Sequence, residues 1–186
     1  MLKEIAVFSD ASFGNKYNCF SKEKKWFLLN KDIAAYGFVI FKDNKDFDDK
    51  NILITCAKTI DVVTANKGYF NYDTICHDFG SEKAELVGFY KAVLFTYLFI
   101  GTKVKVKFYS DLLSMVNWLN DVVIIKPSQE KYTLITQIKL LLSKFKNAKV
   151  IWVNRDQNKH AHNLVKKYFD ELKIKNGVAV ETIGVF

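Results

Sequence analysis

The chain has 186 residues, 49% of them hydrophobic, which is enough for one domain to bury its own core. With only eight Gly and one Pro, the composition excludes a collagen-like or disordered chain. The 28 Lys and Arg outnumber the 20 Asp and Glu, and this net charge of +8 favours a polyanionic partner.

Five apolar runs predict strands. The first is hydrophobic at nearly every position, as expected for a strand that is buried on both faces. The second and third are separated by the turn-rich segment DNKDFDDK. The predicted strands span 3–9, 34–42, 51–60, 103–109 and 148–153.

Helices are predicted at 82–99, 112–120, 129–146 and 159–173, where apolar residues recur every three or four positions. Ser81 precedes the first helix as a cap, and Gly177 follows the last as a stop signal. Three strands followed by helices that alternate with two more strands predict an α/β fold, with a five-stranded mixed sheet flanked by helices. Strands 1–3 are expected to be antiparallel, and strands 4 and 5 parallel.

Three segments fall outside this plan. Residues 15–33 and 61–80 are interpreted as insertions, and the tail, 176–186, can add a short strand. No linker rich in Gly, Ser or Pro divides the chain, so we expect a single domain over 1–186.

The chain offers no obvious membrane segment or disulfide framework. Its longest apolar stretch, 86–101, is interrupted by Lys91 and falls short of the roughly 20 residues that span a bilayer. The three cysteines are scattered, and their odd number fits a reducing compartment. We therefore expect a soluble, cytoplasmic protein that does not bind membranes.

Four polar residues that can bind metal lie at the ends of predicted elements. Asp10 and Asp111 end the first and fourth strands, Glu85 lies one turn into the first helix, and His162 lies in the first turns of the last helix. Ligands collect at the carboxyl ends of strands in an open α/β sheet. Carboxylates gathered there repel one another unless a cation neutralises them, and a pair of ions roughly 3.5–4 Å apart is the usual arrangement for phosphodiester cleavage.

Each of these residues alone has a simpler interpretation. An Asp after a strand commonly forms a turn, a Glu in the first helical turn complements the helix dipole, and a single His is commonly structural. Their order, spacing and element types together favour a shared site.

The same residues make the chain resemble the type 1 ribonuclease H family between Ile5 and Leu172. The matching segments are FSDAS followed by Gly14 and Asn15, then AAYGFVIF, SEKAEL, FYSDLLSMVNWL and VIWVNRDQNKHAHNLV. The resemblance implies a ribonuclease H-like fold and an endonuclease that hydrolyses the RNA strand of an RNA–DNA hybrid with two Mg²⁺ or Mn²⁺ ions. Asp10 would bridge both ions, and Glu85 and Asp111 would hold the ion nearer the leaving group.

The fourth family position, normally Asp, is His162 in this chain. A neutral imidazole binds hard Mg²⁺ less well than a carboxylate does, so Mn²⁺ is the expected preference. Three roles stay open for His162: a metal ligand, a proton shuttle beside the attacking water, or a residue that fills a lost ligand position in a weakened site.

The resemblance also implies substrate contacts. Ser12, Gly14 and Asn15 are candidates for the RNA strand, where a 2′-hydroxyl distinguishes RNA from DNA. Trp118 is a candidate for packing on the DNA backbone, with a core role as the alternative, and Lys83 and Arg155 are candidates for phosphate contacts.

Two other functions remain possible from the sequence. One is a catalytically weakened or inactive protein that binds hybrids or other nucleic acids. The other is a nuclease of the same fold with a different nucleic-acid substrate. We expect a monomer in every case.

Overall fold

The computed structural model describes residues 2–14, 19–20, 26–29, 33–42, 47–60, 80–127 and 131–180. The strands are β1 Glu4–Gly14, β2 Cys19–Phe20, β3 Trp26–Leu29, β4 Ile33–Phe41, β5 Ile52–Ile60, β6 Lys105–Ser110, β7 Asn147–Trp152 and β8 Gly177–Val180. The helices are α2 Ser81–Phe95, α3 Leu113–Leu119, α4 Tyr132–Leu142 and α5 Lys159–Asn176, with short helical turns at η1 Asp49–Asn51 and η2 Thr96–Ile100. Nearly all of the predicted insertion 61–80 lies outside the described residues, as do Asn15 and 181–186.

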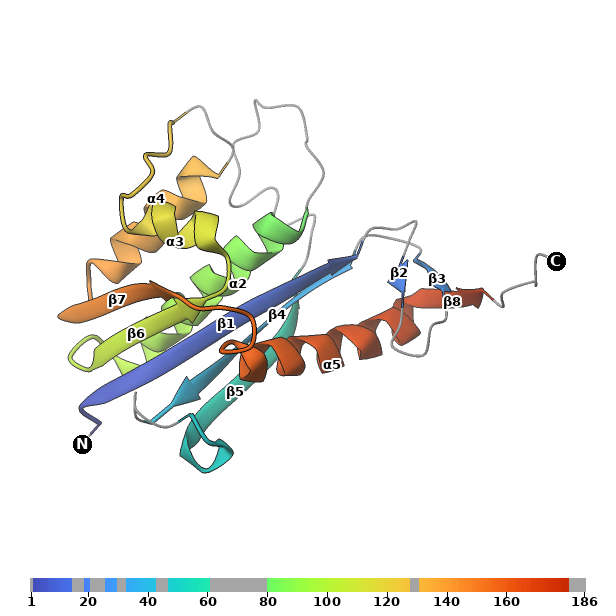
Figure 1. Cartoon of the computed structure of the whole chain (residues 1–186), viewed down its shortest axis with the longest axis horizontal. Coiled ribbons are helices and arrows are strands. Elements are labelled where there is room, and N and C mark those ends of the chain that lie inside the picture. The colour runs from blue at the N-terminus through green and yellow to red at the C-terminus, as the bar shows by residue number, and fades with distance from the viewer. Residues whose placement is uncertain are drawn as a thin grey trace.

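Five strands form the main sheet in the order β5-β4-β1-β6-β7 (Figure 1). β1 and β4 are antiparallel, as are β4 and β5, whereas β1, β6 and β7 run parallel to one another. The predicted mixed sheet is therefore confirmed. β1 is longer than the predicted 3–9, because its pairing with β4 continues to the Gly14–Ile33 pair after β6 has ended.

Both faces of the sheet are buried. Successive side chains of β1 point to opposite faces, so this strand contributes to a core on each side. Ile5 and Val7 pack in one core with residues of α2 and α4, whereas Ala6 and Phe8 pack in a second core that includes Ala161 of α5. Figure 1 shows the same arrangement, with α2, α3 and α4 on one side of the sheet and α5 on the other. Any site at the end of β1 is therefore reached by helices from both sides.

A second, smaller sheet pairs the insertion with the tail. Its order is β2-β3-β8, and β3 pairs antiparallel with β8 over Trp26–Leu29. The expected tail strand is confirmed, whereas β2 and β3 within the insertion were not predicted. α5 ends at Asn176, directly before the predicted stop at Gly177.

The helices differ from the sequence prediction in their ends. α2 begins at Ser81, so Gly80 rather than Ser81 occupies the cap position. The end of the predicted helix 82–99 is the π-helical turn η2. No helix among the described residues combines the length and the apolar character needed to cross a membrane.

Candidate active site

Three carboxylates from distant parts of the chain meet at one edge of the sheet. Asp10 lies within β1, Glu85 in the second turn of α2, and Asp111 directly after β6. One oxygen of each lies within 4.8 Å of the others. The predicted grouping of these carboxylates is therefore present in the structure.

The pairing of β1 with β6 explains why the two aspartates are neighbours. The parallel ladder ends at the Phe8–Tyr109 pair, so Asp10 and Asp111 both follow its last rung. Asp111 is presented by a turn in which Ser110 Oγ accepts a hydrogen bond from the Leu112 amide at 3.1 Å. The position is the carboxyl edge of the parallel strands, where α/β sheets bind ligands.

Close helix packing brings Glu85 to the same edge. A Cβ atom added to Gly88 would lie 3.0 Å from Cβ of Tyr36 and 3.4 Å from the Asp10 carbonyl oxygen. α2 can therefore approach β1 closely only because residue 88 has no side chain. Glu85 lies three residues earlier, about one turn along the helix, and so reaches Asp10 and Asp111.

Burial and mutual repulsion raise the pKa values of two of the carboxyl groups. Burial, followed by the charges of Asp10 and Asp111, raises the pKa of Glu85 from 4.5 to about 9. Burial also raises the pKa of Asp10, against the lowering effect of its hydrogen bond to His162, and the nearby Asp111 charge adds to the rise. A divalent cation bound among these carboxylates would offset the repulsion between their negative charges. Hard divalent cations also prefer oxygen ligands, so the group fits such an ion.

His162 joins this group from the other face of the sheet. Its Nδ1 atom lies 2.9 Å from Oδ2 of Asp10. Because a carboxylate only accepts, Nδ1 carries the hydrogen, and in the neutral ring Nε2 is then the acceptor. Nη2 of the exposed Arg155 lies 3.2 Å from Nδ1 and 3.5 Å from Nε2, and with Nδ1 protonated only Nε2 can accept a hydrogen bond from it. Arg155 therefore also borders the site. His160, two residues earlier, instead faces Asp49 at 3.4 Å.

Asn158 is a site residue that the sequence did not reveal. It precedes α5 and is fully buried, and its Nδ2 donates to Asp111 Oδ1 at 2.8 Å and to the Ser9 carbonyl at 3.0 Å. An Asn directly before a predicted helix reads as a cap, and its spatial partner lies 47 positions away. No local sequence pattern could therefore predict the contact between Asn158 and Asp111.

The predicted substrate residues are spread around the carboxylates. Ser12 and Gly14 lie on the part of β1 that extends beyond β6, and Asn15 lies outside the described residues. Lys83 is buried in α2, with 5% of its surface exposed. Arg155 contacts His162, whose ring is hydrogen-bonded to Asp10. The roles of the predicted substrate residues in binding stay predictions.

Trp118 belongs to a polar cluster that joins three helical segments. Lys131 lies 5.1 Å above its ring, and Lys131 also forms an ion pair with Glu82. Glu82 in turn accepts a hydrogen bond from Ser114 at 3.0 Å. Trp118 also packs against the main core, so the core role considered for it is confirmed. Lys131 was not predictable from the sequence, because its pairing with Glu82 is a tertiary contact.

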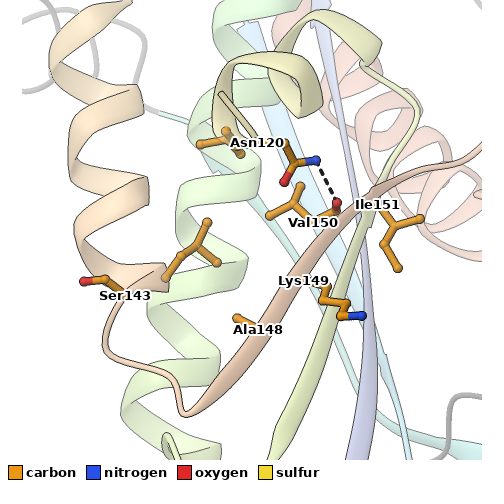
Figure 2. A pocket seen from close by; sticks show the side chains of 8 residues that line it. Asn120, Ser143, Ala148, Lys149, Val150 and Ile151 are labelled. Atoms are coloured by element: carbon orange, nitrogen blue, oxygen red, sulfur yellow. Dashed lines mark hydrogen bonds between the residues drawn. The ribbon is translucent and has the colours of Figure 1, made fainter. Parts of the chain in front are cut away.

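A separate pocket of about 400 Å³ lies beside the edge strand β7. Figure 2 shows Asn120, at the end of α3, donating across it to the Val150 carbonyl, at 3.0 Å. None of the residues that line this pocket is a carboxylate. It is therefore distinct from the candidate active site.

Comparison with known proteins gives the family. The model of the family described as reverse transcriptase-like matches residues 76–168, which is half of the chain. No curated protein sequence matches the chain.

The solved structures with this fold include several ribonucleases H. Ribonuclease H1 of the halophilic archaeon Halobacterium salinarum is 14% identical, covers 90% of this chain and 98% of its own, and superposes with a TM-score of 0.61. The N-terminal ribonuclease H domain of a Mycobacterium tuberculosis protein is 17% identical, with coverage of 93% and 97% and a TM-score of 0.59.

A third structure is LC11 ribonuclease H1, isolated from compost and solved with an RNA/DNA hybrid. It is 18% identical, with coverage of 91% and 99% and a TM-score of 0.57. With half of its length matched by the family model and its sheet and helices arranged as in these enzymes, the chain belongs to the reverse transcriptase-like family and has the type 1 ribonuclease H fold.

Proposed function

We propose that this protein is an endonuclease that hydrolyses the RNA strand of an RNA–DNA hybrid by a mechanism that uses two divalent metal ions. The observation that carries the proposal is the convergence of Asp10, Glu85 and Asp111 within 4.8 Å on a ribonuclease H fold. The hybrid bound in the LC11 ribonuclease H1 structure supports the substrate class.

Asp10, Glu85 and Asp111 would hold the ions. Mg²⁺ or Mn²⁺ bound there would supply Lewis-acid stabilisation of the charge that develops on the scissile phosphate. The chain itself holds Asp10 in place through both oxygens: Oδ1 accepts from the Ala11 amide at 2.8 Å, and Oδ2 accepts from His162. Each carboxylate oxygen keeps a further lone pair for a cation.

His162 and Arg155 complete the site on the side of α5. With Nδ1–H directed at Asp10, the Nε2 atom of His162 is the one that can accept a proton from an attacking water. The exposed Arg155 guanidinium next to it can bind a phosphate oxygen of the substrate. His162 therefore acts as a positioned proton acceptor rather than as a simple replacement for a carboxylate ligand.

The remaining candidates would grip the hybrid along the sheet edge. Ser12, Gly14 and Asn15 would meet the RNA strand, and Trp118 with Lys131 would meet the DNA backbone. Lys83 is too buried for the phosphate contact expected from the sequence. The ion pair of Lys131 with Glu82 supports this role for Lys131, because it holds the ammonium over the Trp118 ring.

Incubation of the purified protein with labelled hybrid, double-stranded RNA or duplex DNA, each with Mg²⁺ or Mn²⁺, tests the proposal. We expect cleavage of the hybrid alone, with 5′-phosphate and 3′-hydroxyl ends, and no activity in Asp10→Asn or Asp111→Asn. Cleavage restricted to duplex DNA would overturn the substrate assignment.

One observation favours a second candidate function. His162 offers no negative charge where the family has Asp, which is consistent with a protein that binds hybrids without cleaving them. Binding without turnover in either metal would support this candidate. A large gain of Mg²⁺-dependent activity in His162→Asp would show that the natural site is weakened at this position.

A further inference from the structure

Asn158 connects three structural elements at the centre of the candidate active site. It lies between the loop after β7 and the start of α5, and none of its surface is exposed. Its Nδ2 group donates to the Ser9 carbonyl of β1 at 3.0 Å and to the Asp111 carboxylate after β6 at 2.8 Å. One amide therefore links β1, which carries Asp10, to the Asp111 carboxylate after β6.

The orientation of this amide leaves a polar atom without a partner. Asn158 Oδ1 is buried and has no hydrogen-bond partner among the described residues. A buried acceptor that lacks a hydrogen bond destabilises the folded state. The reversed orientation would not help, because it would place Oδ1 against two acceptors, the Ser9 carbonyl and the Asp111 carboxylate. Stability of the fold alone therefore does not explain Asn158 at this position, whereas its hydrogen bond to Asp111 does.

Oδ1 of Asn158 does not act as the cap of α5. An Asn before a helix commonly uses Oδ1 to accept from an amide of the first turn, and this bond stabilises the helix. In this structure Oδ1 makes no such bond, and only the Asn158 carbonyl accepts from α5, from the His162 amide at 3.0 Å. The side chain is directed at the carboxylate group at the expense of its cap function.

We propose that Asn158 is a positioning residue that sets the affinity of the site for divalent metal through Asp111. The Asn158 Nδ2–H group donates to Oδ1 of Asp111 and so holds the Asp111 carboxylate in a single orientation. The remaining lone pairs of that carboxylate stay available to a cation. Groups that orient a metal ligand in this way change metal affinity by about 10- to 100-fold. The inference depends on the metal site of the proposed function.

Isothermal titration of the whole protein with Mn²⁺ tests this role. Asn158→Leu keeps the side-chain volume and removes both the donor and the unpaired acceptor, so its melting temperature in EDTA should remain within a few degrees of the unsubstituted protein. Its Mn²⁺ affinity should fall about 10- to 100-fold. Asn158→Ala should lose a similar factor, and Asn163→Ala, an exposed change on the same helix, should leave the affinity unchanged.

The background of Asp111→Ala separates a positioning role from a structural one. If Asn158 acts through Asp111, then adding Asn158→Leu to Asp111→Ala should cause no further loss of Mn²⁺ affinity. Unchanged affinity in Asn158→Leu, an equal loss in both backgrounds, or failure of both Asn158 variants to fold in EDTA would overturn the inference. Absence of Mn²⁺ binding by the unsubstituted protein would instead overturn the proposed function, and this inference with it.

Discussion

His162 of α5 lies 2.9 Å from Asp10 of β1, through Nδ1 and Oδ2, although 152 positions separate the two residues. The contact joins the helix on one face of the sheet to a carboxylate that Glu85 approaches from α2, on the other face. His162 thereby fixes one oxygen of the most buried member of the carboxylate group and directs Nε2 away from it. This geometry supports the proton-acceptor role that we propose for His162.

His162→Ala is expected to lower the rate of hybrid cleavage about 100-fold, because it removes both a proton acceptor and a hydrogen-bond donor to Asp10. Steady-state cleavage assays measure this effect. His160→Ala is the matched control, since His160 pairs with Asp49 and should leave the rate unchanged. Equal rates in the two variants would contradict the role given to His162.

Glu85 makes the stability of the metal-free protein depend on pH. Its pKa is raised from 4.5 to about 9 in the folded protein, so the folded state binds this proton more tightly than the unfolded state does. The corresponding stabilisation is complete below pH 4.5 and is lost as the pH rises towards 9. Each kcal/mol lost lowers the melting temperature by about 2–4 °C in a chain of this size.

Glu85→Gln carries no titrating group at this position, so the stability of the variant is expected to fall less as the pH rises. Melting curves in EDTA at several pH values compare the two proteins, and the variant should melt higher near neutral pH. Excess Mn²⁺ should raise the melting temperature of the natural protein more at high pH than at low pH. Identical pH profiles for both proteins in EDTA would show that folding does not raise the pKa of Glu85.

Gly37 sets how closely α5 approaches the sheet. It pairs with Asp10 across β1 and β4, and a Cβ atom added to it would lie 2.7 Å from Cγ2 of Val165. Gly37→Ala should therefore cost about 1–3 kcal/mol of unfolding free energy and displace His162, one turn before Val165. Urea denaturation measures this cost.

Val165→Ala removes the atom that would collide with the new methyl group. On its own it should also destabilise the protein, because Val165 is fully buried. In combination with Gly37→Ala, however, the total loss should be smaller than the sum of the two single losses. Strict additivity would show that the contact does not limit the approach of α5.

Lys131→Ala is expected to lower the affinity for hybrid and to make that affinity less sensitive to salt concentration. Loss of one phosphate contact lowers the slope of log affinity against log salt concentration by about 0.9. The slope can be measured with the Asp10→Asn protein, which should bind hybrid without cleaving it. Lys139→Ala is the control, because it also breaks an ion pair, with Asp121, outside the Trp118 cluster. A salt slope that responds equally to both changes would contradict the placement of DNA at Trp118.

The main sheet and the carboxylate group were predictable because their signals are local. Asp10 and Asp111 each follow an apolar run, and Glu85 lies near the start of a predicted helix, so element ends alone indicate where they meet. The separation of His160 from His162 was predictable as well, since residues two apart on a helix face different directions.

The contacts that could not be predicted are tertiary. β3 has four residues and pairs with a tail strand about 150 positions away, so neither strand carries a periodic pattern of useful length. Asn158 has the sequence signature of a helix cap, and only the folded chain brings its amide to Asp111. The pair of Glu82 and Lys131 likewise depends on how α2 packs beside the segment before α4.

Diffraction from a crystal soaked in Mn²⁺ tests the central claim most directly, because the anomalous signal of manganese locates the ion without reference to activity. We predict a strong anomalous peak bound by oxygens of Asp10, Glu85 and Asp111, and its loss in Asp111→Ala. Manganese bound elsewhere, or absent from these carboxylates while the protein is folded, would contradict the account.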